Sequence, residues 1–239
     1  MFGVSTFCLH SEPLFSALDK ISSVTDYIEV MDEGLHYLES SEPLMSYSGK
    51  FSLHAPSRGT NIASLLEPIR RASVEVMRQC FQIAADVNAS VVVHPGYFAW
   101  AEERTRAENQ LRTSLSDLDR LGQEFSVQFF IENMGNWDYF FLKTPDEISL
   151  IGNTPFALDV GHAYLNNCLT EFLDVPAGHY HLHDNNGKVD SHLAIGEGTI
   201  EFGPVIKAIQ KNRILPVVEV ATWEGILKSI HTLTLLHSQ

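Results

Sequence analysis

Histidine, aspartate and glutamate side chains stand at or just after the ends of six successive short apolar runs in this sequence. Five are histidines and four are carboxylates: His54, His94, Glu132, Asp159, His162, His181, Asp190, His192 and Glu219. One histidine in such a position is more often a hydrogen-bonded structural residue than a ligand. Six successive runs ending this way would gather uncompensated polar groups in one place, which is costly unless a cation pairs with them.

The ligand chemistry of these nine residues indicates which ions they could hold. Imidazole and carboxylate without thiolate suit zinc first, with manganese, iron or cobalt as alternatives. Nine ligands exceed what one ion needs, so we expect two or three divalent ions that share bridging carboxylates. Cys8, Cys80 and Cys168 show no C-x-x-C spacing and predict neither a disulfide framework nor a thiolate metal site.

The apolar runs alternate with amphipathic stretches along the whole chain. The strand candidates are Gly3–Leu9, Tyr27–Met31, Phe51–His54, Ser90–His94, Gln128–Glu132, Phe156–Val160, Tyr180–His183 and Val217–Val220. Helical periodicity is clearest in Leu65–Asn88 and Glu102–Phe125. Thr144-Pro145-Asp146-Glu147 predicts a helix start, with a capping threonine and a proline at the first helical position.

Eight strand–helix units in 239 residues predict a single (β/α)8 TIM barrel that occupies residues 1–239 as one domain. In such a barrel the active site lies at the carboxyl ends of the strands, where the nine residues stand. A doubly wound open sheet is the alternative. It lacks support because Cys8-Leu9-His10-Ser11 replaces the glycine-rich phosphate loop after the first strand.

Composition limits the partners and the compartment. The chain has 16 basic and 30 acidic residues, and its net charge of −14 opposes attraction to nucleic acid or anionic lipid. No apolar run approaches the roughly 20 residues of a membrane span, and the first residues do not resemble a secretory signal. We therefore expect a cytoplasmic protein with no membrane association and no obligate protein partner.

Several motifs resemble those of the xylose isomerase-like TIM barrels and, within them, the endonuclease IV family. The most specific is His181-Leu182-His183-Asp184 followed by Asp190-Ser191-His192 and Gly196-Glu197-Gly198-Thr199-Ile200, which is similar to the family's H-L-N-D, D-x-H and G-E-G-x-I run. Further matches are Asp159-Val160-Gly161-His162-Ala163, His94-Pro95-Gly96, Glu132-Asn133 and Asn61-Ile62-Ala63-Ser64.

The resemblance implies three ions, one for each set of ligands. His54, His94 and Glu132 would hold the first ion. Glu132 would bridge to a second ion, which Asp159, His181 and Glu219 also hold. His162, Asp190 and His192 would hold the third.

The metal centre predicts a hydrolase of endonuclease IV type that acts on a phosphoester, either abasic-site DNA or a smaller phosphorylated substrate. Clustered divalent ions generate hydroxide near neutral pH and stabilise the charge on attacking and leaving oxygens. The alternative is a metal-dependent sugar or sugar-phosphate isomerase or epimerase, with Glu132 and Glu219 as the acid–base pair. A non-catalytic metal-binding protein is a third hypothesis. About one ion per chain would indicate isomerisation, and three would indicate hydrolysis.

Other residues near the expected mouth are candidates for substrate contact. Tyr97 and Trp137 follow the fourth and fifth strands and could stack on a ring or base. Arg58 and Lys188 are the basic residues nearest to predicted ligands, and Asn61 lies in a motif shared with the family. His183 shares strand parity with His181, which makes it a candidate either for supporting the metal ligands or for acid–base catalysis. The expected partner is a small phosphorylated or carbohydrate substrate, or damaged DNA.

Overall fold

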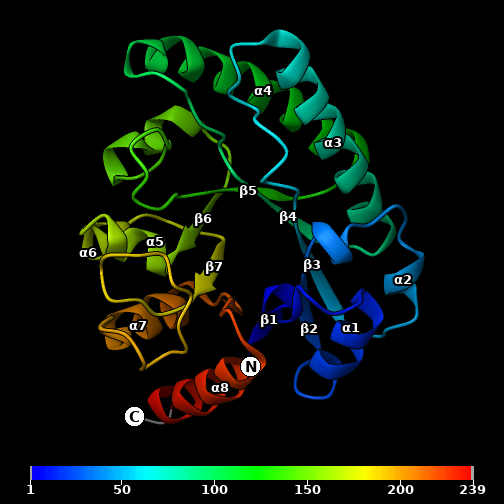
Figure 1. Cartoon of the computed structure of the whole chain (residues 1–239), viewed down its shortest axis with the longest axis vertical. Coiled ribbons are helices and arrows are strands. Elements are labelled where there is room, and N and C mark those ends of the chain that lie inside the picture. Colours follow the sequence, from blue (N-terminus) through cyan, green and yellow to red (C-terminus); the bar gives the residue numbers. More distant parts are fainter. Residues whose placement is uncertain (1, 238–239) are drawn as a thin grey trace.

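The computed structural model describes residues 2–237, in which eight parallel strands close into a barrel in chain order (Figure 1). The predicted (β/α)8 TIM barrel is therefore confirmed. The strands are β1 (Gly3–Ser5), β2 (Tyr27–Met31), β3 (Lys50–His54), β4 (Ser90–Val93), β5 (Phe129–Glu132), β6 (Phe156–Asp159), β7 (His179–Leu182) and β8 (Val217–Val218).

Helices of uneven length surround the strands. They are α1 (Leu14–Ser22), α2 (Glu42–Met45), α3 (Glu67–Asp86), α4 (Arg104–Phe125), α5 (Val160–Leu165), α6 (Leu169–Phe172), α7 (Phe202–Asn212) and α8 (Trp223–His237). The two longest, α3 and α4, lie side by side, and α3 contacts β3 and β4 (Figure 1). Four short 3-10 helices complete the ring: η1 (Thr6–Leu9), η2 (Gly34–His36), η3 (Ala101–Glu103) and η4 (Pro145–Ile151).

Several predicted boundaries differ from the structure. The first predicted strand is too long, because its second half, Thr6–Leu9, forms η1 with the Ser5 side chain as its cap. The helix expected after Thr144 is the 3-10 helix η4, and the Thr144 side chain makes no capping hydrogen bond. The last strand ends at Val218, two residues earlier than predicted.

Alternate strand residues face the inside of the barrel, and this alternation positions the site. In β2, Ile28 and Val30 join the main core that packs against the helices, whereas Glu29 faces inward and contacts Ser52 of β3. Val92, Phe130 and Ala157 form a small apolar cluster that is separate from this core. Several polar side chains, among them Glu29, Ser52 and His181, are buried beside one another inside the barrel.

None of the helices within residues 2–237 is both long and apolar enough to cross a bilayer.

Candidate metal centre

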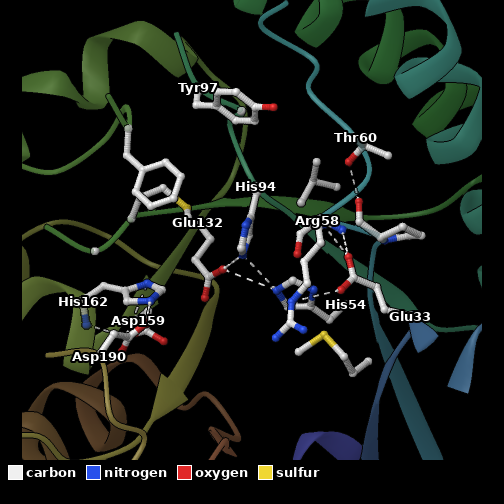
Figure 2. Close-up of a pocket in the computed structure, with 18 of the residues that line it drawn as sticks. Glu33, His54, Arg58, Thr60, His94, Tyr97, Glu132, Asp159, His162 and Asp190 are labelled. Carbon is white, nitrogen blue, oxygen red and sulfur yellow. Dashed lines mark hydrogen bonds and ion pairs between the residues drawn. The ribbon is translucent and has the colours of Figure 1, made fainter. Parts of the chain in front are cut away.

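Three neighbouring strands bring together a first ligand group, His54, His94 and Glu132. His54 ends β3, His94 follows β4, and Glu132 ends β5. The Nε2 atoms of the two histidines lie 3.1 Å apart. Nε2 of His94 also lies 2.9 Å from Oε2 of Glu132. Figure 2 shows these side chains converging on one point at the barrel mouth. Their ligand atoms all lie within 4.8 Å of one another, which is compatible with one shared ion.

A second ligand group consists of Asp159, His181 and Glu219, from the ends of β6, β7 and β8. Nδ1 of His181 lies 3.2 Å from Oε2 of Glu219 and 4.0 Å from Oδ2 of Asp159. The same nitrogen makes a very short contact with Oε1 of Glu132. Glu132 therefore lies between the first and second groups, as a bridging carboxylate would.

A third ligand group lies beside the second and contains His162, Asp190 and His192, together with His183. Nε2 of His162 is 3.0 Å from Oδ2 of Asp190, and Nε2 of His192 is 3.5 Å from Oδ1 of the same residue. The structure thus brings all nine predicted ligands close together at the barrel mouth, and a further possible group, Glu132, Asp159 and His162, links the three sets. His183 is an addition to the predicted set.

Backbone carbonyls orient several of these imidazoles. Nδ1 of His54 lies 3.1 Å from the carbonyl oxygen of Ala55, and Nδ1 of His162 lies 2.9 Å from that of Asn133. Nδ1 of His192 lies 2.7 Å from the carbonyl of Glu219. A proton donated from Nδ1 to a carbonyl leaves Nε2 free to bind an ion, which is the usual arrangement behind a metal-binding histidine.

The electrostatics of the groups show strong mutual attraction. Burial would lower the pKa of His54, but Glu132 and Glu219 raise it to about 9. Burial likewise opposes the charged form of His192, and Asp190 and Glu219 raise its pKa to about 9. For Asp190 burial would raise the pKa, yet His162 and His192 hold it well below its usual value. Carboxylates thus favour the protonated form of His54 and His192, whereas burial lowers the pKa of His94, and a bound cation would displace the protons of the first two.

The residues fit a divalent cation by a further criterion. Oε2 of Glu132 is fully buried and receives no hydrogen bond of good geometry, although two imidazoles lie beside it. A buried carboxylate oxygen without a hydrogen bond is costly, and a cation would remove that cost. The orphaned oxygen and the imidazole and carboxylate donors together match the preferences of zinc and similar ions.

A cavity of about 590 Å³ opens above the ligand groups. Its walls include Tyr97 and Trp137, whose ring centroids lie 5.7 Å apart, and Arg58, which reaches in from the loop after β3 (Figure 2). These three predicted substrate residues lie where a bound molecule could touch them. Lys188 is exposed and is not among the residues that line this cavity, so its predicted substrate contact has no support from its position.

Asn61 has a structural position in place of the predicted substrate contact. Its side-chain oxygen accepts hydrogen bonds from the backbone N–H groups of Ala63 and Tyr97, and its Nδ2 donates to the carbonyl of Tyr97. Gly96 passes so close that a Cβ there would lie 2.4 Å from the Asn61 oxygen, and its φ of 82° also favours glycine. Asn61 therefore holds the loop that carries His94 and Tyr97.

His183 also differs from its predicted role. Its side chain is fully buried, stacks on the His192 ring at a centroid distance of 3.8 Å, and has Nε2 3.0 Å from Oδ1 of Asp159. It is not among the residues that line the cavity. His183 cannot reach a substrate from this position, and its geometry places it with the third ligand group.

Asp184 holds the loop that carries two ligands of the third group. Its carboxylate accepts hydrogen bonds from four backbone N–H groups, those of Asn185, Gly196, Gly198 and Ile200. A Cβ at Gly198 would lie 2.3 Å from Oδ1 of Asp184, which explains the glycine. The H-D and G-E-G motifs are thus joined by the buried hydrogen bonds of Asp184, which close the loop that contains Asp190 and His192.

We expect Asp184→Asn to lower the free energy of unfolding by about 2–3 kcal/mol, because the amide nitrogen cannot accept two of the four hydrogen bonds. Ion binding by the third group should weaken, while the first and second groups keep their ions. Urea denaturation and metal analysis would measure both effects. Asp174→Asn on the exposed surface is the matched control and should change neither. Unaltered metal content in Asp184→Asn would show that the hydrogen bonds of Asp184 are not needed for ion binding by the third group.

Two polar residues of the barrel interior were absent from the sequence prediction. Glu29 lies in the middle of β2 and His179 is the first residue of β7, so neither stands at the carboxyl end of its strand. Glu29 is fully buried and its carboxylate contacts both His179 and His181. The available signal was an acid inside the otherwise apolar run Tyr27–Met31, at an inward-facing position.

The fold and the site together define a TIM barrel with adjoining groups of candidate metal-ligand residues at its mouth. The chain belongs to the xylose isomerase-like TIM barrel family, whose sequence pattern matches residues 40–233. Uncharacterized protein MJ1614 of Methanocaldococcus jannaschii is 34% identical over 221 residues, which cover 85% of this chain and 88% of the relative.

Solved structures show the same architecture. A D-tagatose 3-epimerase-like protein is 28% identical, with a TM-score of 0.91 over 99% of this chain and 97% of that one. The IOLI protein with a bound zinc atom is 16% identical, with a TM-score of 0.79 over 98% of this chain and 97% of that one, and shares the fold. The likeness to the D-tagatose 3-epimerase-like protein backs the predicted isomerase or epimerase alternative better than the predicted phosphoester hydrolase.

Proposed function

We propose that this protein is a metal-dependent sugar or sugar-phosphate epimerase or isomerase. The observation that carries this proposal is the placement of Glu132 and Glu219, which both line the cavity and both approach Nδ1 of His181 from different strands. The likeness to a D-tagatose 3-epimerase-like protein at 28% identity supports the same reaction class.

The ligand groups would hold one or more divalent ions, with zinc as our first expectation. An ion bound by Glu132, Asp159, His181 and Glu219 would supply Lewis acidity to a carbonyl and its neighbouring hydroxyl. Glu132 ends β5 and Glu219 directly follows β8, with β6 and β7 between these strands, and so the two carboxylates approach the cavity from different sides. One carboxylate can remove the proton next to the carbonyl and the other can return a proton to the opposite face of the same carbon.

The size and lining of the cavity favour a small polar substrate, one face of which packs against aromatic side chains. Its volume of about 590 Å³ lies within the range of small-molecule sites. Tyr97, Trp137 and Phe140 form one wall, which suits the face of a ring. Among the described residues lining the cavity, Arg58 is the one lysine or arginine, which argues against a nucleic-acid backbone as the substrate.

We expect Arg58→Ala to raise KM for a phosphorylated sugar by about three- to tenfold, with little change in kcat. The Arg58 side chain is 82% exposed and only loosely paired with Glu33 at 3.7 Å, so it is free to meet a phosphate in solvent-screened surroundings. Steady-state kinetics with matched phosphorylated and unphosphorylated sugars would measure this. Lys188→Ala is the control and should leave both KM values unchanged.

Phosphoester hydrolysis is the second candidate, and the third ligand group is the observation that favours it. His162, His183, Asp190 and His192 offer ligands beyond those that isomerisation needs. Two measurements on protein purified without chelator separate the candidates: elemental analysis, and solvent deuterium incorporation into a panel of ketoses. Incorporation next to the carbonyl supports the epimerase. The hydrolase proposal would replace the epimerase proposal if the protein binds three ions, incorporates no deuterium into the ketoses and cleaves a model phosphodiester.

A further inference from the structure

Below the metal-ligand groups, a chain of buried polar side chains crosses the inside of the barrel. Oγ of Ser52 donates a hydrogen bond of 2.8 Å to Oε2 of Glu29 and accepts one of 3.0 Å from the hydroxyl of Tyr27. Nε2 of His179 lies 3.0 Å from the same carboxylate oxygen. The other oxygen, Oε1, lies 2.7 Å from Nε2 of His181. Glu29 is 0% exposed, so its orientation is fixed from every side.

The ring nitrogen of His181 that points away from the ligand centre has a different partner from that of three other histidines in these groups. Those three, His54, His162 and His192, place Nδ1 against backbone carbonyls and present Nε2 to the centre. His181 is reversed: Nδ1 faces Asp159, Glu219 and Glu132, and Nε2 meets a carboxylate. A carboxylate behind an imidazole accepts its proton more strongly than a neutral carbonyl does, and makes the opposite nitrogen a better donor to a metal.

We infer that Glu29 is a positioning residue for ion binding at the second ligand group. It holds the His181 proton on Nε2 and directs the Nδ1 lone pair toward the ion. Ser52 donates a hydrogen bond to the other oxygen of Glu29 and His179 lies beside it, which favours one orientation of this carboxylate behind the His181 ring. Glu29 itself does not line the cavity, and in this role it acts on the ion through His181 and not as a ligand.

This inference rests on ion binding at the second group, which is part of the proposed function, and it does not depend on the reaction. The test compares Glu29→Gln with the wild type by competition titration of zinc against a chelating dye. We expect the affinity for one zinc ion to fall about 10- to 100-fold in the variant, with binding to the remaining groups unchanged. Asp32→Asn is the matched control, because Asp32 is also a buried acid but its carboxylate accepts a hydrogen bond from the backbone N–H of Leu38.

A second measurement needs no variant. Long-range ¹H–¹⁵N correlation spectra of the zinc-loaded wild type should show His181 with its proton on Nε2 and Nδ1 bound to the metal. A His181 proton on Nδ1, or a Glu29→Gln affinity within twofold of the wild type, would overturn the inference. Absence of zinc binding by the wild type would instead refute the metal-dependent function, so the two failures are distinguishable.

Discussion

Replacing Glu219 by glutamine is expected to lower the rate of epimerisation by about a thousandfold while the metal content stays close to that of the wild type. Glutamine keeps the shape and one ligand oxygen but cannot exchange a proton with the substrate. Glu132 remains in the variant on the other side of the cavity. One epimer should therefore still exchange its carbon-bound hydrogen with deuterium from solvent, whereas the other epimer should not. Glu132→Gln should show the opposite preference.

Proton NMR in D2O would follow this exchange for each epimer of a ketose pair. Glu201→Gln is the matched control, since Glu201 is exposed and outside the cavity lining, and it should retain full activity. Metal analysis of each variant separates loss of acid–base chemistry from loss of the ion. Exchange of both epimers at the wild-type rate in Glu219→Gln would show that the acid–base assignment is wrong.

Strand-end residues were predictable because the geometry of a parallel barrel brings all carboxyl ends to one mouth. A run such as Phe129–Glu132 identifies both the strand and the end at which its acid stands. The grouping of His54 with His94, and of Asp159 with Glu219, follows from strand order around the barrel. The division of these ligands into three groups came from family motifs, since spacing alone does not define which side chains share an ion.

The sequence did not predict the positions of residues that lie in the middle of a strand or behind the side chains that line the cavity. Glu29 meets His181 across 152 positions of the chain, and this contact depends on the register and tilt of strands in the closed barrel. Strand parity indicated that His183 faces inward, but not that its ring would pack against Gly161 and out of reach of the cavity. Asn61 illustrates the same limit, because family motifs contain loop-holding residues as well as ligands.

Zinc affinity is expected to rise steeply between pH 6 and pH 9, because the ion must displace protons that the ligand groups hold. The pKa values of His54 and His192 are each raised to about 9, chiefly by carboxylates that overcome the opposing effect of burial. Both imidazoles are therefore protonated at neutral pH when no ion is bound. Each displaced proton contributes about a tenfold gain in affinity per pH unit below its pKa. Calorimetry in buffers of different ionisation enthalpy would count the protons released.

The stability of the ion-free protein should change with pH in the opposite direction. A histidine whose pKa is raised by folding stabilises the fold fully below its unfolded value, near 6.5, and loses that contribution as the pH rises through about 9. The melting temperature after chelation should thus fall between pH 6.5 and pH 9. Saturation with zinc should remove this decline and raise the melting temperature, because the ion binds only the folded ligand groups. Parallel declines with and without zinc would mean that these histidines do not bind the ion, and the metal centre would have to lie elsewhere.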